Sequence, residues 1–352
     1  MKSMNELTDY FQEREAQDQY SGVVLITQGD TQLFAGAYGY ASRAWHVPNT
    51  LAMRFDTASI TKLFTAVAIL QLIEQGQLTF DTGVIDFLGL AGTAISRDVN
   101  VYHLLTHTSG IADDADEEAG ESYEEIWQTK ANYSVIETVD FLPQFAYKPA
   151  NFAPGQGCRY CNCGYILLGL LIEQISGMGY RDYVQERIFA PAGMVHSAFL
   201  HKDQVHEKVA EGCEPLTDDK GQIVGWRKNI YAYPPIGSPD GGAYVTAGDL
   251  DRFLRAVQRG QLLAPELTAA FFTPQVYHHQ RQDLTVDYGY GLVFYKDTTG
   301  KVVCYQKEGI NAGVSGMLRY FPAQDISVVL LSTLSEGVWE PVWEIHKRVV
   351  EK

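Results

Sequence analysis

Runs of apolar residues at the two ends of the chain predict β-strands. Residues 22–30 and 32–40 are β-rich runs with a Gly-Asp turn signal between them, which is typical of a hairpin. Three more strand candidates lie near the C-terminus, at residues 301–307, 314–321 and 326–333. Strands from both chain ends therefore predict one shared sheet.

Helical patterns replace the strands in the middle of the chain. Residues 59–75 predict an apolar helix, which Asp56 or Thr57 can cap at its start and Gly76 can end. Further helices are expected at the first residues of the chain and at about 164–176, 248–259 and 337–350.

These elements predict an α+β fold, an α/β sandwich. In it an antiparallel sheet formed by both chain ends is flanked by helices, and a mainly helical region is inserted between them. Because neither an internal repeat nor a linker divides the sequence, we expect a single domain over residues 1–352. Its sheet part covers about 1–58 and 295–352, and its helical part about 59–294. Connections as long as this one usually carry function.

The charge balance and the cysteine count narrow the possible partners. The formal net charge is −16, so a nucleic acid or an anionic membrane would repel the protein. The longest apolar runs, such as residues 166–172, are too short to span a bilayer. An odd number of cysteines, five, suits a reducing compartment. We expect a cytoplasmic protein, or an extracytoplasmic one if a leader has been removed from the chain.

The tetrapeptide SITK at residues 59–62 is the first chemical signal. Ser59 lies in the first turn of the predicted helix, and Lys62 follows on the same face. A neutral lysine amine can accept the proton that a serine must lose before it attacks a carbonyl, and burial favours the neutral amine. The helix N-terminus adds positive potential for an oxyanion. The alternative is an exposed Ser/Lys pair on an ordinary helix.

The tripeptide YCN at residues 160–162 is the second signal. A tyrosine near two lysines is expected to shift toward phenolate, so that Tyr160 acts as a base toward Ser59 and later as an acid toward the leaving group. Asn162 is expected to orient a substrate amide or to hold Lys62. The alternative is a turn without function after Pro154-Gly155.

The tripeptide KEG at residues 307–309 is the third signal. Lys307 supplies a cation, and Gly309 is expected to let a substrate lie close against the strand backbone. The N–H groups of Ser59 and Ile310 are the expected oxyanion hole. This tripeptide says little by itself, but the three signals in this order are far more specific.

The order S-x-x-K, Y-x-N and K-x-G resembles the motif set of the penicillin-recognising serine hydrolases. Its tyrosine version resembles the class C β-lactamases, the D-Ala-D-Ala carboxypeptidases and related esterases, and this resemblance implies a β-lactamase/transpeptidase-like fold. The resemblance extends over about residues 20–335 and includes the segments 103–111 (HLLTHTSGI), 154–180, 187–194 (RIFAPAGM) and 241–254.

This resemblance implies an acyl-enzyme cycle on an ester, amide or lactam, in which water finally releases the acid. Tyr160 and Lys62 would share the proton transfers, while Lys307 would lower the pKa of Tyr160 and attract an anionic substrate group. His107 is expected to hold the loop beside the helix rather than to act in catalysis. No cofactor or metal is called for. The expected partner is a small-molecule or peptide substrate, and the oligomeric state is left open.

The third motif departs from the family pattern at Glu308, where Thr or Ser usually helps to bind a substrate carboxylate. A carboxylate facing the site would oppose an anionic ligand, whereas strand alternation can also turn Glu308 away. The expected substrate is an ester, an amide or a D-amino-acid peptide, with weak turnover of β-lactams. The aromatic stretches 226–237 and 288–291 either wall an acyl pocket or serve packing.

Two alternatives compete with this hypothesis. One is a β-lactamase or penicillin-binding D,D-peptidase proper, and the other is a non-catalytic protein that binds peptidoglycan peptides or acts as a scaffold. The intact Ser59, Lys62, Tyr160 and Lys307 argue against the second.

Three further sequence features could indicate other functions: a cysteine cluster, an acidic run and a pair of histidines. Cys158, Cys161 and Cys163 are expected to be small packing residues, with a zinc site or an acidified redox thiol as alternatives. The acidic run 113–125 is expected to be a solvated loop or helix face. His278 and His279 are expected in a surface loop without a matching ligand set.

Overall fold

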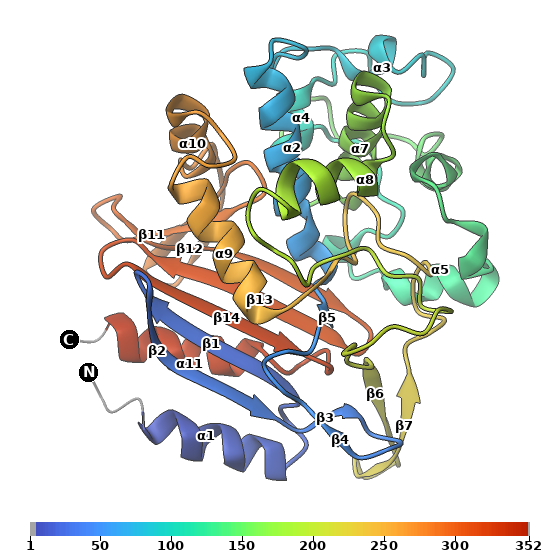
Figure 1. Cartoon of the computed structure of the whole chain (residues 1–352). Coiled ribbons are helices and arrows are strands. Elements are labelled where there is room, and N and C mark those ends of the chain that lie inside the picture. Colours follow the sequence, from blue (N-terminus) through green and yellow to red (C-terminus); the bar gives the residue numbers. More distant parts are fainter. Residues whose placement is uncertain (1–4, 351–352) are drawn as a thin grey trace.

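An eight-stranded antiparallel sheet forms the centre of the computed structural model, which describes residues 5–350 (Figure 1). In spatial order its strands are β2 (Thr31–Tyr38), β1 (Gly22–Gln28), β14 (Ile326–Ser332), β13 (Val314–Phe321), β12 (Val302–Asn311), β11 (Val293–Lys296), β10 (Leu284–Tyr288) and β9 (Val276–Arg281). The order confirms the predicted hairpin near the N-terminus and the shared sheet built from both chain ends.

The middle of the sheet is apolar on both faces. Strands β13 and β14 are buried along their whole length, and β1 pairs with β14 from Gly22↔Ser332 to Gln28↔Ile326. A strand covered by helices on both sides gains from apolar residues at every position, so these strands read as nearly continuous apolar runs instead of alternating ones. The predicted α+β class is confirmed.

Helices cover the two faces of the sheet (Figure 1). On one face lie α1 (Asn5–Ala16) and α11 (Trp339–Val350), and on the other lie α9 (Ala247–Gln258) and the helical region. The remaining helices are α2 (Lys62–Glu74), α3 (Val84–Phe87), α4 (Val101–Leu105), α5 (Tyr123–Thr129), α6 (Leu142–Phe145), α7 (Asn162–Ser176), α8 (Tyr180–Val184) and α10 (Pro265–Phe271). Within residues 5–350, none of these helices combines the length and the apolar character that a bilayer crossing needs.

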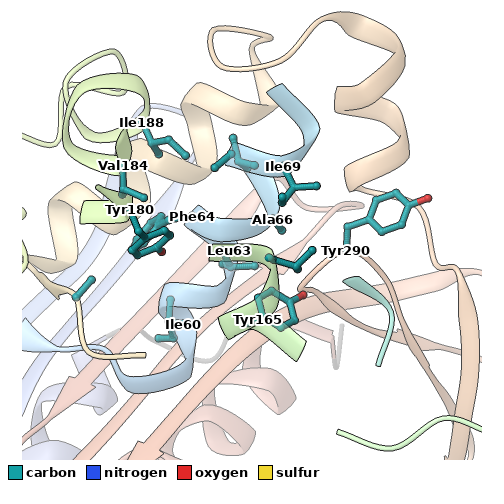
Figure 2. Close-up of a cluster of buried hydrophobic side chains, with 14 of the residues drawn as sticks. Ile60, Leu63, Phe64, Ala66, Ile69, Tyr165, Tyr180, Val184, Ile188 and Tyr290 are labelled. Atoms are coloured by element: carbon teal, nitrogen blue, oxygen red, sulfur yellow. The ribbon is translucent and has the colours of Figure 1, made fainter. Parts of the chain in front are cut away.

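Helix α2 is the centre of the helical region. Its residues are apolar on every side, which is the pattern of a helix surrounded by protein. Figure 2 shows its Leu63, Phe64 and Ile69 packed among Tyr165, from α7, and Tyr180, from α8. Gly76, at a φ of +70° just after the helix, ends it as expected.

Short turns and strand pairs connect these layers. The 3₁₀ turns are η1 (Ala58–Thr61), η2 (Glu117–Ala119), η3 (Asn132–Ser134) and η4 (Thr138–Phe141), and η5 (Gln185–Phe189) is a π turn. The small strand pairs are β3 (Tyr40–Ser42) with β4 (Val47–Pro48), β5 (Phe55–Asp56) with β8 (Tyr244–Val245), and β6 (Cys213–Thr217) with β7 (Ile223–Lys228).

The sheet extends further than the sequence pattern indicated. Strands β9, β10 and β11 lie between residues 276 and 296, a segment that we expected in the helical part. Strand β9 (VYHHQR) is mainly exposed at the sheet edge, so it lacks the apolar alternation by which a strand is recognised. The sheet part of the domain therefore begins closer to residue 276 than to 295.

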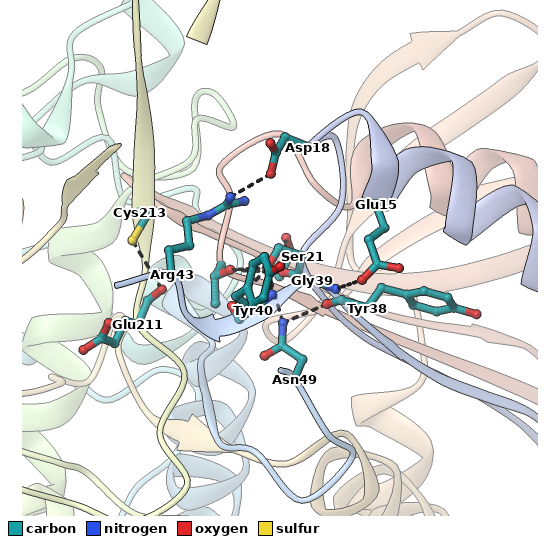
Figure 3. A network of polar contacts seen from close by, with 12 residues as sticks. Glu15, Asp18, Ser21, Tyr38, Gly39, Tyr40, Arg43, Asn49, Glu211 and Cys213 are labelled. Carbon is teal, nitrogen blue, oxygen red and sulfur yellow. Dashed lines mark hydrogen bonds and ion pairs between the residues drawn. The ribbon is translucent and has the colours of Figure 1, made fainter. Parts of the chain in front are cut away.

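A polar network fixes the chain where the N-terminal hairpin leaves the sheet (Figure 3). The Asn49 side chain donates to the carbonyl oxygen of Tyr38 at 2.8 Å and to Oγ of Ser21 at 3.3 Å. Arg43 pairs with Asp18 at 2.7 Å. Because these contacts join residues distant in sequence, they hold the start of β1 against the segment that leads to η1.

Candidate active site

Ser59 lies in the turn η1, directly before helix α2, so the predicted helix starts as a 3₁₀ turn. The preceding residue, Ala58, has a φ of +43°, an unfavourable conformation for a residue with a side chain. Two hydrogen bonds stabilise it: its N–H donates to Oδ1 of Asp56 at 2.8 Å, and its carbonyl accepts from the N–H of Gly242. Asp56 thus accepts the first N–H of this turn from just outside it, whereas Thr57, at the N-cap position, makes no capping bond with its side chain, and its hydroxyl donates to the carbonyl of Ala243.

Glycines in β12 and β13 let η1 lie directly on the sheet. A Cβ atom at Gly309 would come within 2.1 Å of the carbonyl oxygen of Thr57 and 3.0 Å of the Ser59 nitrogen, and one at Gly316 would meet Ile60 at 2.9 Å. We expected Gly309 to admit a substrate, but the backbone of the Ser59 turn occupies this space instead. Gly309 thus positions Ser59.

The amine of Lys62 lies among three oxygen atoms. Its Nζ is 3.1 Å from Oγ of Ser59, 2.8 Å from Oδ1 of Asn162 and 2.6 Å from the carbonyl oxygen of Asp240. Burial lowers the pKa of Lys62, although Asp240 and other nearby carboxylates oppose the shift. A neutral amine can donate two N–H groups to the two carbonyl oxygens and direct its lone pair at the Ser59 hydroxyl.

Asn162 is the first residue of α7, and the sequence patterns missed the residue that caps this helix. The Asp113 carboxylate accepts the N–H of Asn162 at 2.7 Å and that of Cys163 at 2.9 Å. Asp113 and Asp114 are buried, so the start of the acidic run is not the solvated surface that we expected. A buried carboxylate that accepts the free N–H groups of a first helical turn is a helix cap.

The ring of Tyr160 lies between two lysines, with its centroid 5.1 Å from Nζ of Lys62 and 4.7 Å from Nζ of Lys307. Burial nevertheless raises the pKa of Tyr160 well above its usual value, with Glu117 adding to the shift and the Ser59 hydroxyl partly offsetting it. The expected shift toward phenolate is therefore wrong, because desolvation of the anion outweighs the nearby cations. Tyr160 is positioned as a neutral phenol that can donate a proton.

Lys307 and Ile310 lie on the part of β12 that borders the site. Lys307 is buried, and burial lowers its pKa to about 8. Among the described residues, β11 pairs with β12 only as far as Gln306, so the β11 side of residues 307–311 lies open. Ile310 and Ser59 line the same cavity, a placement compatible with a shared oxyanion hole.

The Glu308 carboxylate is held by a neighbouring side chain of its own strand. Its Oε2 accepts a hydrogen bond from the Gln306 amide at 3.0 Å, on the sheet face opposite to Lys307. It still borders a cleft of about 300 Å³, which is lined by Ser59, Glu117, Glu118, Tyr160, His278, Tyr288, Lys307, Glu308 and Ile310. Three carboxylates and one lysine thus border this cleft.

Two histidines support the wall of this cleft. His107 is buried, its Nδ1 accepts the N–H of Cys161 at 3.1 Å, and its ring packs 4.6 Å from that of Tyr160. Burial and the two lysines lower its pKa well below the usual value, so it is neutral and acts as an acceptor. His278 lies in β9, 3.4 Å from Glu118, and lines the cleft, contrary to the expected surface loop.

The cysteines are packing residues in this environment. Cys161 and Cys163 are buried, and burial raises the pKa of both thiols and raises that of Cys158 to about 12. The acidified thiol that we considered is therefore wrong. Cys163 offers a possible metal ligand together with Asp113 and Asp114, but both oxygens of Asp113 already accept backbone N–H groups.

Comparisons with known proteins show what the whole chain is similar to. The crystal structure of a penicillin-binding protein from Bacillus halodurans is 36% identical, with a TM-score of 0.87, over 96% of this chain and 99% of that one. Penicillin-binding protein 4 of Amycolatopsis lactamdurans is 28% identical over 88% of this chain and 80% of its own length. Esterase EstB of Burkholderia gladioli is 28% identical over 70% of this chain and 68% of its own. The family model described as Beta-lactamase matches residues 7–344, and the chain therefore belongs to this family.

Proposed function

We propose that this protein is a serine hydrolase that forms an acyl-enzyme on Ser59. The observation that carries the proposal is the contact between the Lys62 amine and the Ser59 hydroxyl, with two carbonyl oxygens accepting the other N–H groups. Burial lowers the pKa of this amine, which favours the form that accepts a proton.

The proposed reaction has two steps. In the first, Oγ of Ser59 bonds to the substrate carbonyl carbon while its proton passes to Lys62, and the N–H groups of Ser59 and Ile310 stabilise the oxyanion. The bond to the leaving group then breaks, and the leaving group takes the proton from Lys62, either directly or through Tyr160, which donates its own proton and receives that of Lys62. In the second step, Lys62 accepts a proton from the attacking water and passes it to Oγ of Ser59 as the bond between Ser59 and the acyl group breaks, which releases the acid and free Ser59.

The preferred substrate is an ester, an amide or a D-amino-acid peptide of a small molecule, with β-lactams as weak substrates. The support is the charge around the cleft, where Glu117, Glu118 and Glu308 outnumber Lys307. An anionic ligand such as a β-lactam carboxylate is repelled by such a rim, whereas a free amine is attracted. A relative named esterase is consistent with this preference.

A β-lactamase or D,D-peptidase proper is the second candidate. The support for it is the likeness to proteins named penicillin-binding and the buried cation of Lys307 beside Tyr160.

The decisive experiment is labelling of Ser59 with a fluorophosphonate, followed by turnover of nitrocefin, p-nitrophenyl esters and D-amino-acid amides. We expect a label on the wild type and none on Ser59→Ala, with esters or amides turned over faster than nitrocefin. Faster nitrocefin turnover would favour the second candidate. Labelling of neither protein, together with no turnover, would leave the non-catalytic binding or scaffold function.

A further inference from the structure

The segment that carries Tyr160 is held by residues from an earlier part of the chain. The backbone N–H groups of residues 159–163 all donate to acceptors that are distant along the sequence. These acceptors are the carbonyl oxygen and Nδ1 of His107, one oxygen of Glu118 and both oxygens of Asp113. The geometry of this part of the site therefore depends on three residues outside it.

Glu118 holds this segment at Tyr160 itself. Its Oε1 accepts the Tyr160 N–H at 2.8 Å, and the same oxygen lies 3.4 Å from Nε2 of His278, in strand β9. The His278 ring in turn packs with its centroid 4.5 Å from that of Tyr288. Burial acts to raise the pKa of Glu118, but the hydrogen bonds from His278 and from the Tyr160 N–H outweigh it, so the pKa is lowered. Glu118 is thus an ionised acceptor that is also fixed from the side of the sheet.

The position of the Tyr160 backbone decides where its hydroxyl lies. The phenol oxygen is at the far end of a rigid ring, so a small rotation of the backbone moves this oxygen further than it moves Cα. The ring lines the cleft together with Ser59, and its centroid is 5.1 Å from Nζ of Lys62. A displacement of about 1 Å at a group that takes part in a reaction lowers the rate by about 10²-fold. Loss of the acceptor for the Tyr160 N–H is therefore expected to act at the hydroxyl.

We propose that Glu118 is a positioning residue, which fixes the Tyr160 backbone so that the phenol protonates the leaving group. In this step Tyr160 gives its proton to the leaving group as the bond to the carbonyl carbon breaks, and it receives the proton that Lys62 took from Ser59. Glu118 acts only through Tyr160. The inference rests on the proposed acyl-enzyme at Ser59 and assigns the route by which its leaving group is protonated.

The test uses neutral butyrate esters whose leaving groups differ in basicity, namely p-nitrophenyl, phenyl and trifluoroethyl butyrate. p-Nitrophenolate leaves readily as an anion, whereas trifluoroethoxide is a stronger base and leaves faster when it is protonated. A displaced Tyr160 should therefore slow the trifluoroethyl ester most. For Glu118→Ala, we expect kcat/KM to fall by about tenfold or more with the trifluoroethyl ester and by no more than about threefold with the p-nitrophenyl ester, since a general acid contributes about 10²–10⁴-fold where it is needed.

Two further variants show whether the hydrogen bond to Tyr160 is responsible. Glu118→Gln keeps an oxygen that accepts the Tyr160 N–H, so the ratios of kcat/KM among the esters should return to near the wild-type values. Glu125→Ala removes an exposed carboxylate of helix α5 from the same acidic run, and as the matched control it should keep the wild-type ratios. Because all the esters are neutral, the loss of a charge beside the cleft does not select among them.

A double variant separates positioning of Tyr160 from a general effect on the fold. In the Tyr160→Phe background no phenol remains to be positioned, so Glu118→Ala should cause no further loss with the phenyl ester. A further loss in this background would overturn the positioning role. Equal losses with all the esters in Glu118→Ala alone, or the same losses in Glu118→Gln, would also overturn it.

These outcomes are distinct from a failure of the proposed function. If the fluorophosphonate labels Ser59 and the p-nitrophenyl ester turns over, the acyl-enzyme stands whatever Glu118 does. Failure to label Ser59 in the wild type would overturn the proposed function itself. Labelling and thermal unfolding of each variant show whether it is folded. If Glu118→Ala does not fold, His278→Phe tests the inference instead: it keeps a ring beside Tyr288 but removes the donor that fixes Glu118, so it should show the same pattern of losses to a smaller extent.

Discussion

The Nζ of Lys62 lies 3.1 Å from Oγ of Ser59, and its other two hydrogen bonds go to carbonyl oxygens. An ammonium would donate its three N–H groups to these three oxygen atoms. It has no lone pair, so it could not accept the proton of Ser59. A neutral amine has its lone pair free for the Ser59 proton, so the protonation state of Lys62 decides the reactivity of the serine.

The first prediction follows from this geometry. The rate of Ser59 acylation by a neutral ester should rise with pH as Lys62 loses its proton, and it should level off below the usual lysine pKa of 10.5, because burial lowers the pKa. Lys62→Arg keeps the charge at all accessible pH values and should lower the rate by about 10²–10⁴-fold. Stopped-flow measurement of acylation tests both.

Lys307→Arg serves as the control for this pH profile. Burial lowers the pKa of Lys307 to about 8, so its charge is lost in the same range, whereas arginine stays charged. The rising limb should persist in Lys307→Arg. If Lys62→Arg kept the wild-type rate and profile, Lys62 would not be the base.

Asp113→Ala should destabilise the protein by roughly 2–5 kcal/mol, because two buried N–H groups at the start of α7 lose their acceptor. Asp113→Asn keeps one acceptor oxygen, so its free energy of unfolding should lie between those of the wild type and Asp113→Ala. The measurement is urea unfolding with an unchanged m-value. Asp218 also accepts two backbone N–H groups, but in an exposed turn, so Asp218→Ala should change stability far less. Equal losses of stability in Asp113→Ala and Asp218→Ala would contradict a role of Asp113 as a buried helix cap.

Gly309→Ala should impair catalysis more than folding. The added methyl would meet the Thr57 carbonyl at 2.1 Å and displace the Ser59 turn, and a displacement of about 1 Å at a reacting group lowers kcat/KM by about 10²-fold. Gly92→Ala, at a position with open space around it, is the matched control. Wild-type kcat/KM in Gly309→Ala would show that the Ser59 turn can move without loss.

His107 should make the protein sensitive to acid. Its folded pKa lies well below the usual 6.5, so the unfolded chain binds a proton that the folded one does not, and stability falls as pH drops below about 6.5. The slope is at most about 1.4 kcal/mol per pH unit. His107→Asn keeps an acceptor for the Cys161 N–H and tolerates the φ of +59°, and it should reduce this slope. If chemical unfolding gave the same slope of unfolding free energy against pH for the wild type and His107→Asn, His107 would not be the source of the acid sensitivity.

The parts of the fold that carry a strong local pattern could be predicted from the sequence. The hairpin of β1 and β2, the three C-terminal strands and the apolar helix α2 have apolar runs bounded by turn residues. The edge strand β9 is polar and has no apolar run, so the sequence did not reveal it. The spacing of Ser59 and Lys62 marked the site, because three residues along a helix place two side chains together.

Other parts of the site depend on burial, which a sequence pattern does not report. Asp113 belongs to an acidic run that is typical of a surface, yet its carboxylate faces the start of α7. The direction of the Tyr160 pKa also follows from burial: counting nearby lysines predicted a phenolate, while desolvation dominates in the folded protein.

The contact between Gly309 and the Ser59 turn joins the nucleophile to the sheet, while Lys62 and Asn162 belong to helices of the inserted region. The expected oxyanion hole of Ser59 and Ile310, which lies in β12, therefore exists only while these two halves are docked. Partial separation of the halves by urea is therefore expected to abolish the proposed hydrolysis before the strands or helices unfold. Activity should then be lost at lower urea concentrations than the circular dichroism signal of the helices and strands, so an activity measurement would detect undocking of the two halves before unfolding.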